Sequence, residues 1–205
     1  MPDFAADAER SRPEKVALRS RLLAARAAMT ASDRRSAATS VQAAILDLVR
    51  RTRPAVIAAY VPVATEPGGA DLPSVLVAHA RVLLPLLLDD ADLDWAEFDG
   101  ALHPGPRGLR QPGGPRLGVD AVRSAGLVLV PAVAVDGTGL RLGRGGGSYD
   151  RVLARIAPET MTVALLYDNE LVESVPAEAH DRTVHAVITP STGLVLCGSP
   201  DRRPA

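Results

Sequence analysis

The sequence predicts an α/β protein, a three-layer α/β/α fold with a largely parallel sheet, preceded by two N-terminal helices. The first observation is a set of apolar runs of strand length, which cover residues 54–64, 81–88, 126–136, 161–168 and 185–190. The second is that segments of helix-forming composition, at 71–80 and 148–157, lie between some of these runs. Buried strands that alternate with helices are typical of a parallel sheet covered on both faces.

Two helices are expected before the sheet. Residues 14–29 carry apolar residues at helical spacing and are rich in helix formers. Residues 30–33 supply cap residues for a second helix, which we expect to run through Arg51. Residues 103–118, in contrast, contain too much proline and glycine for regular structure, so we predict a long loop of the kind that is often functional.

The composition is that of one globular unit. At 205 residues and 47% hydrophobic residues, the chain is long enough for one sizeable core. We expect a single domain over residues 14–198, with disordered segments at 1–13 and 199–205. Cys197 is the single cysteine, so no disulfide can form within the chain, which favours a reducing, cytoplasmic setting. The net charge of −1 and the lack of a membrane-spanning apolar run predict binding neither to nucleic acid nor to membranes, and we expect a monomer.

The stretch GLRLGRGGGSYDR, residues 139–151, is the main candidate for a binding site. It follows the apolar run 126–136 and precedes a predicted helix, and ligands of α/β sheets bind beyond the carboxyl ends of the strands. Glycines let backbone N–H groups approach phosphate oxygens, and the helix N-terminus adds partial positive charge. Arg141 and Arg144 would add planar cations suited to phosphate. The alternative is a mobile glycine loop with solvated arginines.

Known phosphate-binding signatures narrow the choice. The chain has no Walker A loop. A dinucleotide fingerprint is approximated by Gly143-x-Gly145-x-x-Ser148, with Asp168 about 20 residues on, but serine replaces the third glycine and the turn out of the strand is longer than that motif tolerates. A hydrolase that uses Ser148 is also disfavoured, because the second glycine of a nucleophile elbow is missing.

Charged residues elsewhere could converge on the glycine loop. Asp150 could hold Mg²⁺ beside a bound phosphate, or it could simply complement the dipole at a helix start. Asp181 precedes a predicted strand and could join the same site, or be an ordinary loop residue. Lys15 and Arg19 lie at i and i+4, so both cations share one helix face, where a common anion would relieve their repulsion. The alternative for this pair is a solvated basic face.

Together these segments resemble the 5-formyltetrahydrofolate cyclo-ligase family, also called methenyltetrahydrofolate synthetase. The resemblance is carried, in this order from about residue 15 to 190, by KVALR, YVPVATE, PAVAVDGTGLRLGRGGGSYDRVL and VPAEAHDRTVHAVIT. It implies an ATP- and Mg²⁺-dependent enzyme that converts 5-formyltetrahydrofolate, with or without a polyglutamate tail, to 5,10-methenyltetrahydrofolate and releases ADP and phosphate. The alternative is a catalytically inactive member that binds nucleotide or folate.

The resemblance also assigns roles to residues. Catalytic roles fall to Arg144, which would neutralise charge on the moving phosphoryl group, and to Tyr149. Residues that match the family's ATP-binding positions are Lys15, Arg19, Arg141, Leu142, Gly143, Arg144, Gly145, Gly146, Gly147, Ser148 and Tyr149. Substrate-binding positions are Glu66, Gly147 and Ser148, and the magnesium carboxylates are Asp150 and Asp181.

Two aromatic residues could also contribute to the site, and two positions differ from the residues that are usual in the family. Tyr60 and Trp95 could line the folate pocket, although aromatic residues beside strands more often belong to the core. Ser148 stands where the family commonly has a tyrosine, so one aromatic contact is lost. Gln111 stands where a glutamate is usual. Neither departure removes a phosphate or metal ligand, so we expect an active enzyme.

Overall fold

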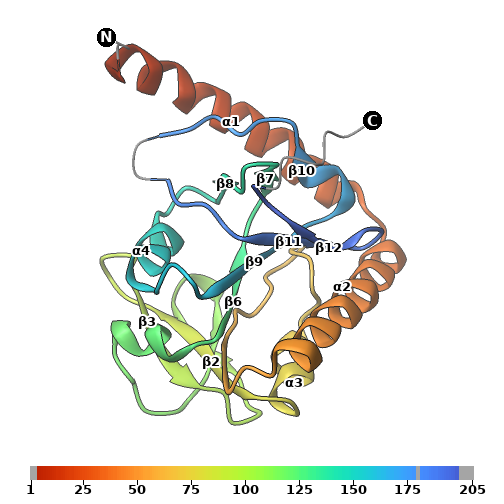
Figure 1. The fold of residues 1–205 in the computed structure, drawn as a ribbon, viewed down its shortest axis with the longest axis vertical. Coiled ribbons are helices and arrows are strands. Elements are labelled where there is room, and N and C mark those ends of the chain that lie inside the picture. The colour runs from red at the N-terminus through yellow and green to blue at the C-terminus, as the bar shows by residue number, and fades with distance from the viewer. Residues whose placement is uncertain (1–3, 179–180, 199–205) are drawn as a thin grey trace.

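A mostly parallel seven-stranded sheet forms the centre of the protein (Figure 1). The computed structural model describes residues 4–178 and 181–198. In spatial order the strands are β12 (Gly193–Leu196), β11 (Ala186–Thr189), β9 (Met161–Leu165), β6 (Leu127–Pro131), β1 (Val56–Ala58), β2 (Arg81–Leu87) and β3 (Leu93–Glu97). The five central strands are parallel to one another, and the edge strands β12 and β3 pair antiparallel with β11 and β2. The predicted fold class is therefore confirmed.

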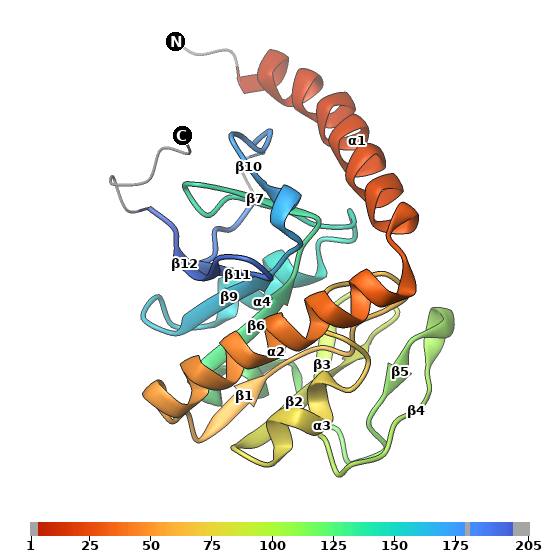
Figure 2. The same cartoon turned by 90° about the vertical axis from the view of Figure 1, so that its right-hand side faces the viewer.

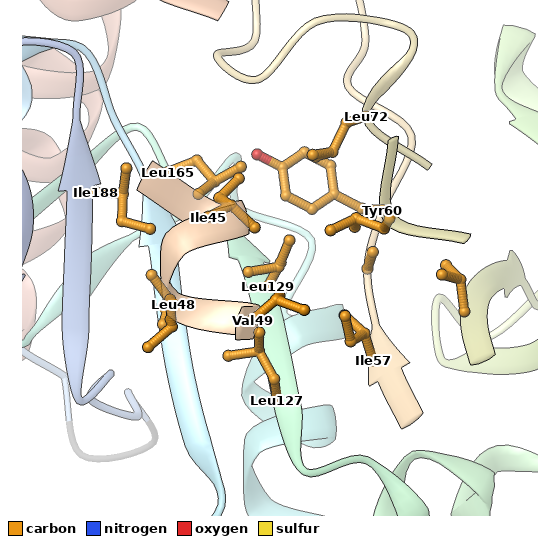
Figure 3. Packing of buried hydrophobic residues seen from close by; sticks show 14 of the residues in the cluster. Ile45, Leu48, Val49, Ile57, Tyr60, Leu72, Leu127, Leu129, Leu165 and Ile188 are labelled. Atoms are coloured by element: carbon orange, nitrogen blue, oxygen red, sulfur yellow. The ribbon is translucent and has the colours of Figure 1, made fainter. Parts of the chain in front are cut away.

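Helices cover both faces of this sheet. Helices α2 (Ala31–Thr52) and α3 (Leu72–Val77) pack on one face, and Figure 3 shows Ile45, Leu48 and Val49 of α2 against Leu127, Leu129 and Leu165 of the sheet. Helix α4 (Ser148–Arg155) and the 3₁₀ helix Val119–Ser124 cover the other face. Consecutive strand residues alternate between the two cores, as the pleat requires, so the apolar runs were correctly interpreted as strands buried on both sides.

Helix α1 (Phe4–Ala28) lies beside a second, smaller sheet (Figure 2). That sheet has the order β10-β7-β8, with β10 at Leu171–Val172, β7 at Ala134–Asp136 and β8 at Arg141–Leu142. Leu22 of α1 packs with Leu142 and other residues of a third apolar cluster there. Residues 4–13 were predicted to be disordered but belong to α1, which begins at Phe4 and contains Pro13. The alanines, Glu9 and the arginines before Pro13 are good helix formers. Residues 1–3 lie outside the described residues.

The second predicted helix is confirmed at its cap. Thr30 is the N-cap of α2, and its hydroxyl accepts a hydrogen bond from the amide of Asp33 at 3.1 Å, while the Asp33 carboxylate accepts one from the Thr30 amide. This reciprocal pair satisfies two backbone groups at the helix start, which is why the chain turns from α1 into α2 at this point.

Other segments differ from the prediction. The predicted loop 103–118 contains a short hairpin of β4 (His103–Pro104) and β5 (Arg110–Gln111), joined by the 3₁₀ turn Pro106–Gly108. The run 126–136 is divided between β6 and β7, which belong to different sheets. Strands β3 and β12 were not predicted. Another 3₁₀ turn, Asp168–Glu170, precedes β10, and the predicted disordered tail 199–205 lies outside the described residues.

Candidate active site

A cavity of about 520 Å³ opens at the carboxyl ends of β1, β2 and β6. Its wall is built from segments far apart in sequence: α1, the chain after β1, the ends of β2 and β6, the β4–β5 hairpin, the glycine loop and the segment before β11. Every residue to which the resemblance assigned a catalytic, binding or metal-holding role lies on this wall, namely Lys15, Arg19, Glu66, Arg141, Leu142, Gly143, Arg144, Gly145, Gly146, Gly147, Ser148, Tyr149, Asp150 and Asp181. The structure therefore brings the predicted residues together in one place.

The glycine loop connects a hairpin to helix α4. Strands β7 and β8 pair antiparallel, the chain then passes through residues 143–147, and α4 begins at Ser148. Gly145 and Gly147 have φ of 99° and 68°, a conformation that other residues rarely adopt. Arg19 of α1 donates a hydrogen bond from Nε to the carbonyl of Gly143 at 2.9 Å. The loop is thus tied to α1 rather than left free.

The two arginines of the loop also have partners. Arg141 is buried, with 4% of its side chain exposed, and its Nη2 lies 2.6 Å from Asp150 Oδ1. Arg144 is half exposed, and its Nε donates to Glu66 Oε1 at 2.9 Å. The alternative of a mobile loop with solvated arginines therefore does not describe this structure.

Two carboxylates and a lysine form the end of the cavity next to α1. Lys15 Nζ contacts Asp181 Oδ2 at 2.6 Å and Glu178 Oε2 at 2.8 Å, and all three side chains are largely buried. The amide of Arg182 donates to Asp150 at 3.4 Å, which brings Asp150 close to the segment that carries Asp181. Glu178 was not predicted, although it lies three residues before Asp181 in the segment already singled out.

Asp150 and Asp181 are too few to hold a metal ion by themselves, but they suit Mg²⁺ that is also bound by phosphate oxygens. Within residues 4–178 and 181–198, no group of three or more His, Cys, Asp or Glu side chains is arranged to hold an ion. Mg²⁺, however, commonly takes only one or two carboxylates together with phosphate oxygens. Asp150 and Asp181 are two such carboxylates on one cavity wall, so the residues present fit Mg²⁺ that arrives with a phosphate ligand.

Glu66 is held in a defined orientation. Its side chain is 9% exposed, Oε2 accepts a hydrogen bond from the Val63 amide at 2.9 Å, and Oε1 accepts from Arg144. Glu66 therefore connects the chain after β1 to the glycine loop across the cavity.

Tyr60, Tyr149 and Trp95 differ in whether they reach the cavity. Tyr60 and Tyr149 line the cavity, and their hydroxyls are buried with no hydrogen-bond partner among the described residues. Burial raises the pKa of both phenols, so they stay neutral. Trp95 is fully buried in the core on the opposite face and is not part of the cavity wall, which confirms the core interpretation for this residue.

The positions of Ser148 and Asp168 test the two alternative functions, a hydrolase that uses Ser148 and a dinucleotide-binding protein that uses Asp168. The Ser148 hydroxyl donates to the carbonyl of Ala91 at 2.6 Å, so it anchors the start of α4 to the turn before β3. Asp168 accepts hydrogen bonds from the amide and hydroxyl of Ser191 and lies away from the cavity wall. A dinucleotide site would need Asp168 to hold a ribose, and its position disfavours that alternative.

The β4–β5 hairpin contributes residues that sequence reasoning had not assigned. Arg107, Leu109 and Arg110 line the cavity together with Gln111. The proline and glycine content of residues 103–118 had suggested a functional loop, but it gave no means of choosing among its residues. Gln111, which stands where the resemblance would place a glutamate, therefore lies on the cavity wall.

The fold and the cavity together define the class of protein. It is an α/β protein with one cavity at the carboxyl ends of parallel strands, and a glycine loop, ion pairs of cations with carboxylates, and apolar residues line this cavity.

Comparison with known sequences gives the family. The sequence model of the 5-formyltetrahydrofolate cyclo-ligase family matches residues 11–190, and the chain belongs to this family of ligases. The resemblance noted in the sequence is therefore confirmed.

Individual relatives agree with this assignment. The chain is 43% identical over 146 residues to a 5-formyltetrahydrofolate cyclo-ligase of Mycolicibacterium smegmatis, an alignment that covers 68% of this chain and 75% of that protein. It is 44% identical over 66 residues to the Escherichia coli protein of that name, covering 32% and 36%. The fold is similar to the 5,10-methenyltetrahydrofolate synthetase of Aquifex aeolicus, with a TM-score of 0.78, 24% identity and coverage of 93% and 96%.

A second solved structure, a 5,10-methenyltetrahydrofolate synthetase from Mycoplasma pneumoniae, gives a TM-score of 0.68 at 18% identity, with 84% of this chain and 96% of that chain covered. At these identities the two structures support the fold only. Separately, no helix in the described part of the chain has the length and apolar character needed to cross a membrane.

Proposed function

We propose that the protein catalyses the ATP- and Mg²⁺-dependent cyclisation of 5-formyltetrahydrofolate to 5,10-methenyltetrahydrofolate, with release of ADP and phosphate. One observation carries the proposal: the Arg144–Glu66 ion pair, at 2.9 Å, joins the glycine loop to the acid expected to contact folate. A phosphate bound by the loop and a ring system bound at Glu66 would therefore meet in one cavity, as a reaction between the two requires.

The charged wall suits the ATP phosphates. Lys15, Arg19 and Arg141 supply cations, and residues 143–147 supply backbone N–H groups before the start of α4. Arg144 is half exposed, and among the described residues its side chain is held through Nε to Glu66. It can therefore turn toward the γ-phosphoryl group and neutralise the charge that develops there.

Asp150 and Asp181 are the residues that would hold Mg²⁺. The metal would supply positive charge beside the phosphate oxygens when bound. Asp150 pairs with Arg141, and Asp181 pairs with Lys15. Both cations stay beside the carboxylates, so they are also in place to bind phosphate.

The other side of the cavity suits folate. The Glu66 carboxylate can accept hydrogen bonds from ring N–H groups, and Val61, Val63 and Leu87 offer apolar surface for a flat ring. Tyr149 lines the cavity from the first turn of α4, and the proposal gives it contacts with both substrates. Gly147 and Ser148 line the same region, with backbone groups rather than the Ser148 hydroxyl available to the substrate.

The chemistry explains why ATP is needed. The N5-formyl group is an amide, and its oxygen is a poor leaving group. When that oxygen takes the γ-phosphoryl group, the bond from phosphorus to the ADP oxygen breaks and an N5 iminium phosphate forms. N10 then attacks the same carbon and loses its proton, and the C–O bond breaks to release phosphate as the ring closes. Positioning and charge neutralisation account for most of the catalysis in phosphoryl transfer.

The wider setting follows from the same proposal. We place the enzyme in one-carbon folate metabolism in the cytoplasm, acting as a monomer on 5-formyltetrahydrofolate with or without its polyglutamate tail. The lone cysteine and the balanced net charge support this setting.

A spectrophotometric assay tests the proposal. Purified protein with 5-formyltetrahydrofolate should give the absorbance of methenyltetrahydrofolate only when both Mg²⁺ and ATP are present. If folded protein gives no product but binds ATP or folate in a titration, the chain is a catalytically inactive binding member of the family, and the proposal is wrong.

A further inference from the structure

We propose that Arg26 and Glu170 form a positioning pair that holds two parts of the cavity wall in register: helix α1 with Lys15 and Arg19, and the chain around Ala132 and Glu66. The inference rests on the proposed function, because it assigns the pair to the same reaction. Neither Arg26 nor Glu170 lines the cavity, so neither is proposed as a catalytic residue.

The pair is buried and connects distant parts of the chain. Arg26 donates from Nε to Glu170 Oε1 at 2.6 Å and from Nη2 to Oε2 at 2.8 Å, and each side chain is 1% exposed. This two-point contact fixes the orientation of the guanidinium as well as its distance. It joins α1 to the 3₁₀ turn before β10, across 144 residues of sequence.

On one side, the pair contacts the cavity wall after β6 and connects, through Tyr167, to the segment that carries Glu66. Arg26 Nη2 also donates to the carbonyl of Ala132 at 2.6 Å, and Ala132 lines the cavity directly after β6. Glu170 Oε2 accepts from the Tyr167 amide at 2.8 Å. The Tyr167 hydroxyl in turn donates to the carbonyl of Thr65, the residue before Glu66, at 3.2 Å.

On the other side, the pair sets the rotation of α1. The buried residues of α1 that the structure describes are Ser11, Lys15, Leu22 and Arg26. Their spacings of four, seven and four place them on one helix face. Leu22 packs in an apolar cluster together with the partly buried Leu18 and Leu23. The ion pairs of Lys15 and Arg26, on either side of this apolar contact, add a fixed direction to the face. Rotation of α1 would move Lys15 and Arg19 away from the phosphate side of the cavity.

One donor of the pair is left without a hydrogen bond among the described residues. Arg26 Nη1 is buried and has no hydrogen-bond partner in the described part of the chain. A buried donor without a partner is costly, and replacing a whole buried ion pair by neutral groups is often tolerated. The arrangement is therefore better explained by the geometry it imposes than by the stability it adds.

The test is a neutral double variant, Arg26→Met with Glu170→Gln. It removes both charges together, so no unpaired charge stays buried, and the glutamine oxygen can still accept from the Tyr167 amide. We expect a folded protein in which kcat/KM falls at least tenfold, with a higher KM for both ATP and 5-formyltetrahydrofolate. A purely structural role would lower Tm and leave the kinetics of the folded protein unchanged.

A matched control uses the ion pair of Arg155 with Asp92. This pair also has two contacts and is largely buried, but neither residue lines the cavity. Arg155→Met with Asp92→Asn should keep kcat/KM within twofold of the wild type. If the Arg26 double variant does not fold, Arg26→Lys, which keeps the charge but not the planar fork, should fold and still lose at least threefold in kcat/KM.

ATP affinity, measured by titration calorimetry, separates this inference from the proposed function. If the wild type binds ATP but makes no product, the proposed function fails, and the Arg26 double variant should still bind ATP at least fivefold more weakly. The inference is overturned if the folded variant matches the wild type in kinetics and ATP affinity, if the control pair loses as much, or if Arg26→Lys is fully active. If the wild type binds no ATP, both proposals fall.

Discussion

The two walls of the cavity differ in how they are held in place. On the wall proposed for ATP, the functional side chains are charged, and ion pairs between α1, the glycine loop and the segment before β11 hold them. On the wall proposed for folate, Tyr60, Val61 and Leu87 are held by the sheet and its apolar cores. The wall proposed for folate is therefore held by apolar packing, whereas the cations of the other wall already pair with carboxylates, and a phosphate would bind beside these ion pairs.

This difference predicts where substitutions act. On the charged wall, each side chain orients another, so a single change should disturb turnover. On the apolar wall, a single change should mainly alter the KM for folate, because its neighbours stay in place. The following variants test this contrast from the largest expected effect to the smallest.

Asp150→Asn should have the largest effect. It removes a proposed Mg²⁺ ligand and the partner of Arg141 together, so turnover with Mg²⁺ and ATP should fall by about 10²-fold or more, while Tm changes little. The absorbance assay measures this loss. Asp168→Asn is the control, because Asp168 bonds to Ser191 away from the cavity, and it should stay active. Wild-type turnover in Asp150→Asn would remove Asp150 from the mechanism.

Lys15→Met should act next most strongly. The lost cation would raise the KM for ATP by roughly 10- to 100-fold, the range expected for a charge-assisted hydrogen bond. Arg12→Met is a matched control, because Arg12 also lies on α1 and contacts Glu178, but its side chain is 83% exposed and off the cavity wall. Equal losses in the two variants would show that general charge, rather than the position of Lys15, matters.

Glu66→Gln should raise the KM for 5-formyltetrahydrofolate by about tenfold and change the KM for ATP much less. The amide keeps the size of the side chain but weakens acceptance from ring N–H groups. Glu97→Gln is the control, because Glu97 also pairs with an arginine, Arg81, on the surface. A change confined to the KM for ATP would contradict the division of the cavity into two walls.

Asp92→Asn should leave turnover unchanged and alter only the pH dependence of the free energy of unfolding, which is the smallest effect of the series. The hydrogen bond from Arg155 lowers the pKa of Asp92. A carboxylate with a lowered pKa stabilises the fold above its unfolded pKa, about 4, and this contribution is lost as the pH falls through the folded pKa. The free energy of unfolding of the wild type, minus that of the variant, should therefore shrink as the pH falls below about 4. A pH-independent difference would contradict the assignment.

Local patterns in the sequence predicted much of the fold. Strands β1, β2, β6, β9 and β11 were predicted because both of their faces are buried, which makes each an apolar run. Strand β3 was missed because Asp94 and Glu97 interrupt its run. The Asp94 carboxylate is satisfied by the amides of Trp95 and Gly118, and the Gly118 contact, 24 residues away, is not visible in a local pattern.

The candidate site was also predicted only where its residues form a local pattern in the sequence. The glycine loop is a continuous motif, and it identified residues 141–150 directly. The partners of these residues come from segments far away: Arg19 bonds to Gly143 across 124 residues, and Lys15 pairs with Glu178 across 163. Such pairings depend on the tertiary fold, and so Glu178 and the buried pair of Arg26 and Glu170 were found only in the structure.

The most direct measurement is the ratio of phosphate released to methenyltetrahydrofolate formed, followed in one reaction of purified protein with Mg²⁺, ATP and 5-formyltetrahydrofolate. The account predicts one phosphate for each methenyltetrahydrofolate, and neither product when ATP or folate is left out. Ring closure without ATP, or phosphate release that does not depend on folate, would contradict the claim that the two walls of this cavity carry out one coupled reaction.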